Sequence, residues 1–197
     1  EKLNPFSSYK SKREKKATFT LWYKVIFACL PAAVIGLAFN SYMEKHFMNA
    51  HVVAFTLILY GILFIIVENY NKHRRPRVRD LDELDYRTAF IIGLFQVLSL
   101  VPGTSRSGST ILGAILFGTS RQVAAEFTFF LAIPVMFGAS FLKLMKFGWS
   151  YTGAEVVILA VGMIVAFIVS ILSIKFLLRY IKHNDFKAFG WYRIILG

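Results

Sequence analysis

The feature that most constrains this chain is a series of long apolar blocks with almost no charge inside them. A helix needs about 20 such residues, each rising about 1.5 Å, to cross about 30 Å of hydrocarbon. Five blocks approach or reach this length: Thr18–Phe39, His51–Val67, Phe127–Leu142, Val156–Ile174 and Phe189–Gly197. The second and third are a little short, and the fifth only begins before the sequence ends. The pattern predicts an all-α, polytopic integral membrane protein.

Composition excludes the main alternatives. Of the 197 residues, 56% are hydrophobic and only 17% are charged, which is too little charge to cover a soluble domain of this size. A disulfide scaffold is excluded because Cys29 is the single cysteine. A net charge of +12 on a soluble fold would suggest nucleic acid, but here the apolar blocks give the charge another meaning, so we predict no nucleic-acid partner.

Basic residues are concentrated in alternate connections. Residues 1–16 carry six Lys or Arg, 72–87 carry six and 175–187 carry four, whereas the other two connections carry one and two. Basic connections stay on the cytoplasmic side. The first span therefore runs outward and the second returns, and membrane lipids are predicted partners of the basic segments.

Two shorter blocks follow the second span and cannot cross a bilayer alone. Residues 88–101 would form a helix of about 21 Å, and 108–118 one of about 16 Å. Because a Pro102-Gly103 break follows the first of them, we predict a re-entrant helical hairpin over 88–118 that enters from the cytoplasm. One kinked span is the alternative.

Polar residues crowd between these two blocks, around Arg106. A charge at membrane depth needs a partner or a water-filled cavity. Thr104 or Ser105 can cap the second helix, whose first turn offers free N–H groups and the positive end of its dipole. Arg106 adds a fork that matches phosphate oxygens, and nearby hydroxyls add donors. We therefore predict a phosphate site; the alternative, a generic Ser-Gly turn, leaves Arg106 unexplained.

The stretch Pro102-Gly-Thr-Ser-Arg-Ser-Gly-Ser-Thr110, preceded by Gly93-Leu-Phe-Gln96, resembles a signature of the bacterial undecaprenyl-pyrophosphate phosphatases, the bacitracin-resistance proteins. Other stretches along nearly the whole chain resemble the same family: Leu30–Gly36, Gly61–Glu68, Leu81–Leu84, Phe117–Arg121 and Ala124–Pro134.

The resemblance implies a multi-pass enzyme of the bacterial plasma membrane. It would hydrolyse undecaprenyl pyrophosphate to undecaprenyl phosphate and inorganic phosphate, which recycles the lipid carrier for cell-wall synthesis and confers bacitracin resistance. The implied catalytic residues are Arg106, Ser105 and Thr110. Those implied to bind substrate are Gly103, Thr104, Ser107 and Gln96, although a merely hydrogen-bonded helix amide is an equal alternative for Gln96.

The sequence departs from the family in lacking its acidic Glu-x-x-x-Glu signature. We therefore expect an internal fragment of a longer protein, and expect Mg²⁺ or Ca²⁺ to be held by residues ahead of residue 1. The family consists of two inverted repeats. Residues 1–69 would be the last two spans of the first repeat, and 70–197 the second repeat, with its spans at 127–142, 156–178 and 189–197. The active site would open to the outer face.

Several alternatives stay open from the sequence. A lipid-phosphate or anion transporter is the second hypothesis, because broken helices with anion sites also occur in transporters. A non-catalytic scaffold would not need Arg106. Glu126 is expected to pair with Arg121 or to cap the next helix, and Lys24 is expected to extend its ammonium to the head groups. The oligomeric state is left open.

Overall fold

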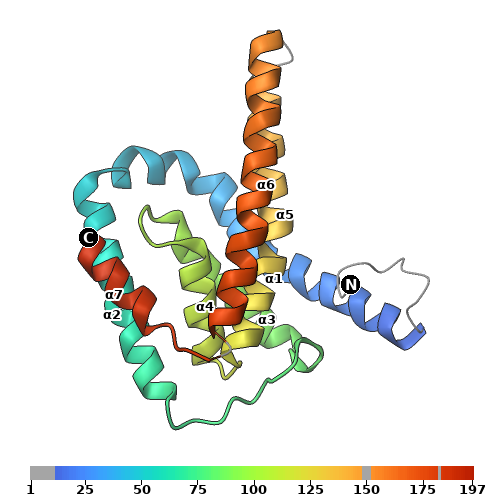
Figure 1. Ribbon diagram of the computed structural model, residues 1–197, viewed down its shortest axis with the longest axis vertical. Helices are drawn as coiled ribbons and strands as arrows, with labels where there is room; N and C mark the ends of the chain where they lie inside the picture. The colour runs from blue at the N-terminus through green and yellow to red at the C-terminus, as the bar shows by residue number, and fades with distance from the viewer. Residues whose placement is uncertain (1–11, 148–151, 182) are drawn as a thin grey trace. The chain divides into compact units, whose positions relative to one another are not determined.

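The structure is a computed structural model that describes residues 12–147, 152–181 and 183–197, apart from the side chains of residues 40, 44, 146 and 147. Its described residues form helices and short turns, with a single isolated β-bridge (Figure 1). The α-helices are α1 Lys12–Phe47, α2 Ala50–Asn71, α3 Tyr86–Val97, α4 Arg106–Leu116, α5 Arg121–Phe147, α6 Gly153–Ile181 and α7 Lys187–Leu196. Two 3₁₀ turns are η1 Leu81–Glu83 and η2 Leu98–Leu100. The all-α prediction is confirmed.

Four helices are long and apolar enough to cross a membrane, which confirms the prediction of a multi-pass membrane protein. They include Lys12–Phe39, Ala50–Asn71, Arg121–Met145 and Gly153–Ile181. These helices are longer than the apolar blocks because the polar residues at their ends continue the helical hydrogen bonding. No residue in the most apolar window of α6 is buried, as expected of a helix that faces lipid.

The chain forms two compact units. The first contains the described residues up to Val135 together with Asp185–Gly197, and the second is Met136–Asn184, which comprises the end of α5 and the whole of α6. These units are defined by packing within the structure. The division into repeats at residues 69 and 70 concerns topology in the membrane and stays a prediction.

Within the first unit, α3 and α4 lie between two groups of helices. Helix α1 packs on α3, α3 on α4, α4 on α2, and α2 on α7 (Figure 1). Glycine permits the closest of these contacts, since a Cβ on Gly93 of α3 would lie 2.1 Å from the carbonyl oxygen of Ala28 in α1. The α3–α4 pair is therefore supported on both sides.

The connection before α3 fixes the entry to this helix pair. The Asp85 carboxylate accepts a hydrogen bond of 2.9 Å from the Thr88 backbone N–H, and hydrogen bonding by Thr88 holds the pKa of this carboxyl below its usual value. The carbonyl of Gly118, just after α4, accepts a hydrogen bond of 3.1 Å from the Val78 N–H. The Val78 carbonyl accepts a hydrogen bond of 2.9 Å from the Ser120 N–H. The start of α3 and the end of α4 are thus both attached to the connection that precedes α3.

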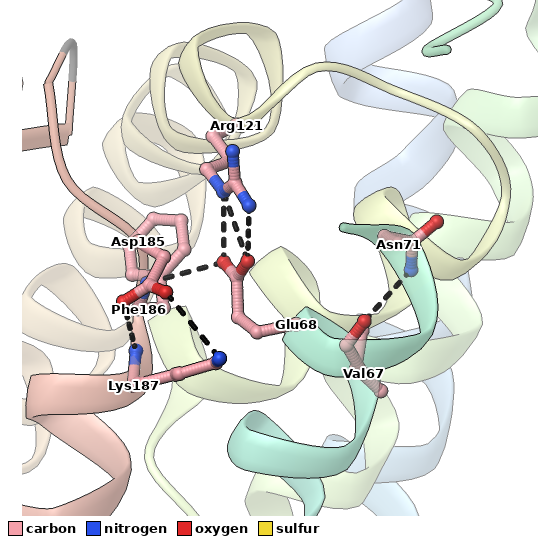
Figure 2. Close-up of polar contacts among 7 residues, drawn as sticks. All are labelled: Val67, Glu68, Asn71, Arg121, Asp185, Phe186 and Lys187. Carbon is pink, nitrogen blue, oxygen red and sulfur yellow. Dashed lines mark hydrogen bonds and ion pairs between the residues drawn. The ribbon is translucent and has the colours of Figure 1, made fainter. Parts of the chain in front are cut away.

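A buried carboxylate joins three further elements of the first unit. The Glu68 side chain at the end of α2 is 1% exposed and accepts hydrogen bonds of 3.0 Å on both oxygens from Arg121 Nε. The backbone N–H of Phe186, ahead of α7, donates to Glu68 Oε1 at 3.1 Å (Figure 2). Glu68 therefore connects α2 to the starts of α5 and α7.

The prediction that Glu126 pairs with Arg121 or caps the next helix is wrong. Both residues lie in α5, five positions apart, and residues with that spacing do not share a helix face. Glu126 instead accepts a hydrogen bond of 2.8 Å from Gln122, one turn before it. The capping bond at the start of α5 is made by Ser120 Oγ, which accepts from the Val123 N–H at 3.2 Å.

We expect Glu68→Ala to destabilise the fold strongly. It leaves the Arg121 guanidinium and the Phe186 N–H without their acceptor, and breaking a buried ion pair typically costs about 3–5 kcal/mol. Because the Arg121 side chain is 39% exposed and can reach water, the lower end of that range applies. The midpoint of thermal unfolding in detergent measures the loss.

Lys187→Gln is the matched control, since it breaks an ion pair with Asp185 whose partners are 30% and 40% exposed and 3.8 Å apart (Figure 2). Such surface pairs contribute about 0–1 kcal/mol. Equal changes in the unfolding midpoint for Glu68→Ala and Lys187→Gln would contradict a structural role for Glu68.

Candidate active site

The polar stretch of the sequence lies at the turn between α3 and α4, which we call the tip and define as residues 101–107. Helix α3 ends at Val97 and η2 continues to Leu100, while α4 begins at Arg106 and packs back against α3. The predicted break between two short helices is therefore present. The placement of this hairpin within the bilayer stays a prediction.

Ser105 caps α4, as one of the two predicted candidates. Its Oγ accepts a hydrogen bond of 3.3 Å from the Gly108 N–H, and its carbonyl accepts from the Ser109 N–H and hydroxyl at 3.0 and 3.1 Å. Among the described residues Ser105 is the single non-glycine residue with positive φ, at φ 67° and ψ 119°. Such conformations cost about 1–3 kcal/mol and gather at functional sites.

Gly103 brings the tip against α2. Its φ of +84° is one that L side chains rarely adopt, and a Cβ there would lie 2.2 Å from Thr56 Oγ1 and 2.7 Å from the Val53 carbonyl oxygen. The Thr56 hydroxyl in turn donates a hydrogen bond of 2.8 Å to the Pro102 carbonyl. These contacts hold one side of the tip on α2.

Arg193 of α7 holds the tip through two carbonyl groups. Its Nη2 donates to the carbonyl oxygens of Gly103 at 2.7 Å and Thr104 at 3.0 Å, and its guanidinium lies 5.8 Å from the centre of the Tyr60 ring. The residue is only 9% exposed. Sequence analysis missed Arg193, although a charge inside a short apolar stretch is the signal that identified Arg106.

The position of Arg106 is difficult to explain by folding alone. Its side chain is half-buried, and its buried Nη1 has no hydrogen-bond partner among the described residues. It is also the first residue of α4, where the helix dipole is positive and disfavours a cation. The first turn adds backbone N–H groups without helical acceptors. A guanidinium in this position is suited to bind an anion.

The remaining predicted residues fall into two groups. Ser107 lies at the tip, with its Oγ 3.4 Å from Ser105 Oγ. Thr104 and Thr110 are buried, and the Thr110 hydroxyl donates to the Arg106 carbonyl at 3.0 Å while accepting from Thr128 Oγ1 of α5 at 3.0 Å. The Thr110 hydroxyl is thus already committed to holding α4 in place.

Gln96 is a buried amide in the last turns of α3. It is 2% exposed, and neither its side-chain nitrogen nor its oxygen has a partner among the described residues. Such groups normally find a partner because an unpaired buried amide is costly. Among the described residues Gln96 is therefore not the merely hydrogen-bonded amide of the alternative prediction. Contact of the Gln96 side chain with substrate stays a prediction.

The described residues do not fit the predicted divalent cation. No three His, Cys, Asp or Glu side chains gather anywhere in the part of the chain that the structure describes. Mg²⁺ and Ca²⁺ take oxygen ligands from carboxylates and carbonyls, whereas the tip offers a guanidinium, hydroxyls and N–H groups. These donors suit an anion, and the expectation that residues ahead of residue 1 hold the cation stays a prediction.

Known proteins are similar to this chain over its whole length. A family described as Bacitracin resistance protein BacA matches residues 2–197. Proteins named undecaprenyl-diphosphatase are 61% identical in Lachnoclostridium phytofermentans, 60% in Desulfitobacterium hafniense and 60% in Enterococcus faecalis. Each alignment covers all of this chain and 72%, 71% and 72% of the relative, respectively. The chain therefore belongs to the BacA family of bacitracin resistance proteins.

Proposed function

We propose that the protein is an undecaprenyl-diphosphatase, a phosphoric anhydride hydrolase that converts undecaprenyl pyrophosphate to undecaprenyl phosphate and inorganic phosphate. This reaction recycles the lipid carrier for cell-wall synthesis and gives bacitracin resistance. Family membership and relatives of that name support it. The observation that carries it is the half-buried guanidinium of Arg106 at the positive end of α4, whose buried Nη1 has no partner among the described residues.

The chemistry of the tip fits a pyrophosphate. Phosphoryl transfer spreads negative charge over the phosphate oxygens, so preorganised cationic and N–H donors stabilise it. We assign the direct contacts to Arg106, to the first-turn N–H groups of α4 and to the Ser105 and Ser107 hydroxyls. Gly103, Thr104 and Thr110 position these groups, because their own polar atoms or contacts are directed into the protein.

The proposed site opens to the outer face of the plasma membrane, an orientation supported by the distribution of basic residues. In the full-length protein with Cys29→Ser, we expect a cysteine at Met48→Cys, between α1 and α2, to react with an impermeant maleimide in intact cells. A cysteine at Arg75→Cys, between α2 and α3, should react only after permeabilisation. Both positions are exposed. Reversed labelling would contradict the orientation.

A transporter of lipid phosphate or anions is the second candidate, favoured by the broken helix pair with a cation at its turn. The full-length protein in proteoliposomes separates the two. Release of inorganic phosphate from a polyprenyl pyrophosphate, without movement of lipid phosphate between leaflets, supports the hydrolase. Movement of lipid phosphate between leaflets without phosphate release would contradict the hydrolase and support the transporter.

A further inference from the structure

A second polar site lies in the first unit, between the start of α1 and η1, and shares no residue with the tip. It is a groove of about 240 Å³. Its lining residues are Arg13, Lys16, Ala17, Thr20, Leu21, Lys24, Leu81 and Asp82. We call this the α1 groove.

Positive charge predominates in the α1 groove. Three of its lining residues are cations, Arg13, Lys16 and Lys24, and Asp82 is its one lining carboxylate. Positions 13, 16, 20 and 24 are spaced by three, four and four residues, which places them along one face of α1. The three cations therefore line the same space, and their positive charges would add in their effect on any group bound there.

Lys24 lies nine-tenths buried in this groove but has no polar partner there. It is 7% exposed, and no hydrogen bond or ion pair joins its ammonium to any residue that the structure describes. Asp82 and Asp85 are close enough to act on its charge but do not contact it, and the Tyr86 ring centre lies 5.8 Å away. The Nζ atom itself is not fully enclosed, in contrast to the buried Nη1 of Arg106, so an anionic ligand in the groove can reach the ammonium and stabilise its charge.

We propose that the α1 groove binds the phosphate headgroup of an anionic phospholipid in the cytoplasmic leaflet. The groove lies where α1 passes from its basic first turns into its apolar block. Tyr23, next to Lys24, and Ile26, two positions after it, are 65% and 54% exposed, so that a neighbouring acyl chain can lie on α1 beside the groove. A Tyr at this depth is typical of the membrane interface, and basic residues on this side attract anionic lipids.

The test is the binding of phosphatidylglycerol to the full-length protein. The lipid is titrated, and native mass spectrometry measures the fraction of protein that carries it. Lys24→Met keeps the length and apolar stem of the side chain but removes its charge, and we expect the apparent Kd to rise at least fivefold. Lys16→Gln should weaken binding in the same direction. Lys24→Arg keeps the charge and should retain most of the affinity.

Lys72→Gln is the matched control, because Lys72 is an exposed cation in another basic connection and does not line the groove. An equal loss of affinity for Lys72→Gln and Lys24→Met would show general attraction to basic segments and overturn the proposal. Unchanged binding by a folded Lys24→Met protein would do the same, and Lys16→Gln decides if Lys24→Met fails to fold. Displacement of the lipid by an equal concentration of inorganic phosphate would identify a free-anion site instead.

Discussion

Replacing Arg106 by alanine is expected to reduce phosphate release from a polyprenyl pyrophosphate by a factor of about 10²–10³, the usual loss for one preorganised donor to developing charge. The guanidinium has a buried nitrogen without a partner among the described residues and lies at the positive end of α4, so we propose that it binds the substrate rather than holding the fold. The measurement is steady-state phosphate release by the full-length protein, with the unfolding midpoint recorded for the same sample.

The controls for Arg106 separate charge from geometry. Arg106→Lys keeps the positive charge but loses the two-pronged donor arrangement, so most activity should still be lost. The unfolding midpoint of Arg106→Ala should stay at or above the wild-type value, since the change removes a half-buried cation that has an unpaired nitrogen. Loss of activity that merely follows unfolding would make Arg106 a structural residue.

Gly103→Ala is expected to lower activity by about 10²-fold without touching any group that we assign to substrate contact. Alanine at φ +84° is strained, and its Cβ would overlap Thr56 Oγ1 at 2.2 Å and the Val53 carbonyl at 2.7 Å. The tip must then move away from α2, carrying Arg106 with it. A shift of about 1 Å in a catalytic group can cost about 10²-fold in rate.

Gly162→Ala in α6 is the matched control for Gly103→Ala. A Cβ at Gly162 meets no atom within 4 Å, and alanine is favoured over glycine inside a helix by about 0.5–1 kcal/mol. Its activity and unfolding midpoint should therefore equal or exceed those of the wild type. Full activity in Gly103→Ala would mean that the contacts of the tip with α2 do not position the site.

The sequence was sufficient to predict the features that depend on short stretches of chain. Apolar length predicted the spanning helices, the Pro102-Gly103 break predicted two short helices, and the preference of serine for helix N-termini predicted the cap at Ser105. Helix bounds were less well predicted, because residues such as Lys12 continue a helix by backbone hydrogen bonding after the apolar pattern has ended.

The contacts that position the site could not be predicted, since they join residues far apart in sequence. Arg193 is 90 residues from the Gly103 carbonyl that it binds, and Glu68 is 53 residues from Arg121. The expected pair of Arg121 with Glu126 does not form, because both residues lie in one helix that directs their side chains apart. Only packing determines which distant partner each charge finds.

The tip is held by two neighbouring helices, through Thr56 of α2 and Arg193 of α7. These contacts explain how Ser105 can keep a strained backbone conformation at the start of α4, because strain persists where surrounding contacts determine the geometry. The same contacts fix the direction of the Arg106 backbone. Preorganisation of this kind lets donors stabilise charge without rearranging during the reaction.

The most direct test of the central claim is a structure of the full-length protein with a non-hydrolysable polyprenyl bisphosphonate bound. We expect the two phosphonate groups at the tip, with the Arg106 guanidinium and the first-turn N–H groups of α4 donating to their oxygens. A bisphosphonate bound elsewhere, with the Arg106 guanidinium still unpaired, would contradict the assignment of the tip as the pyrophosphate site.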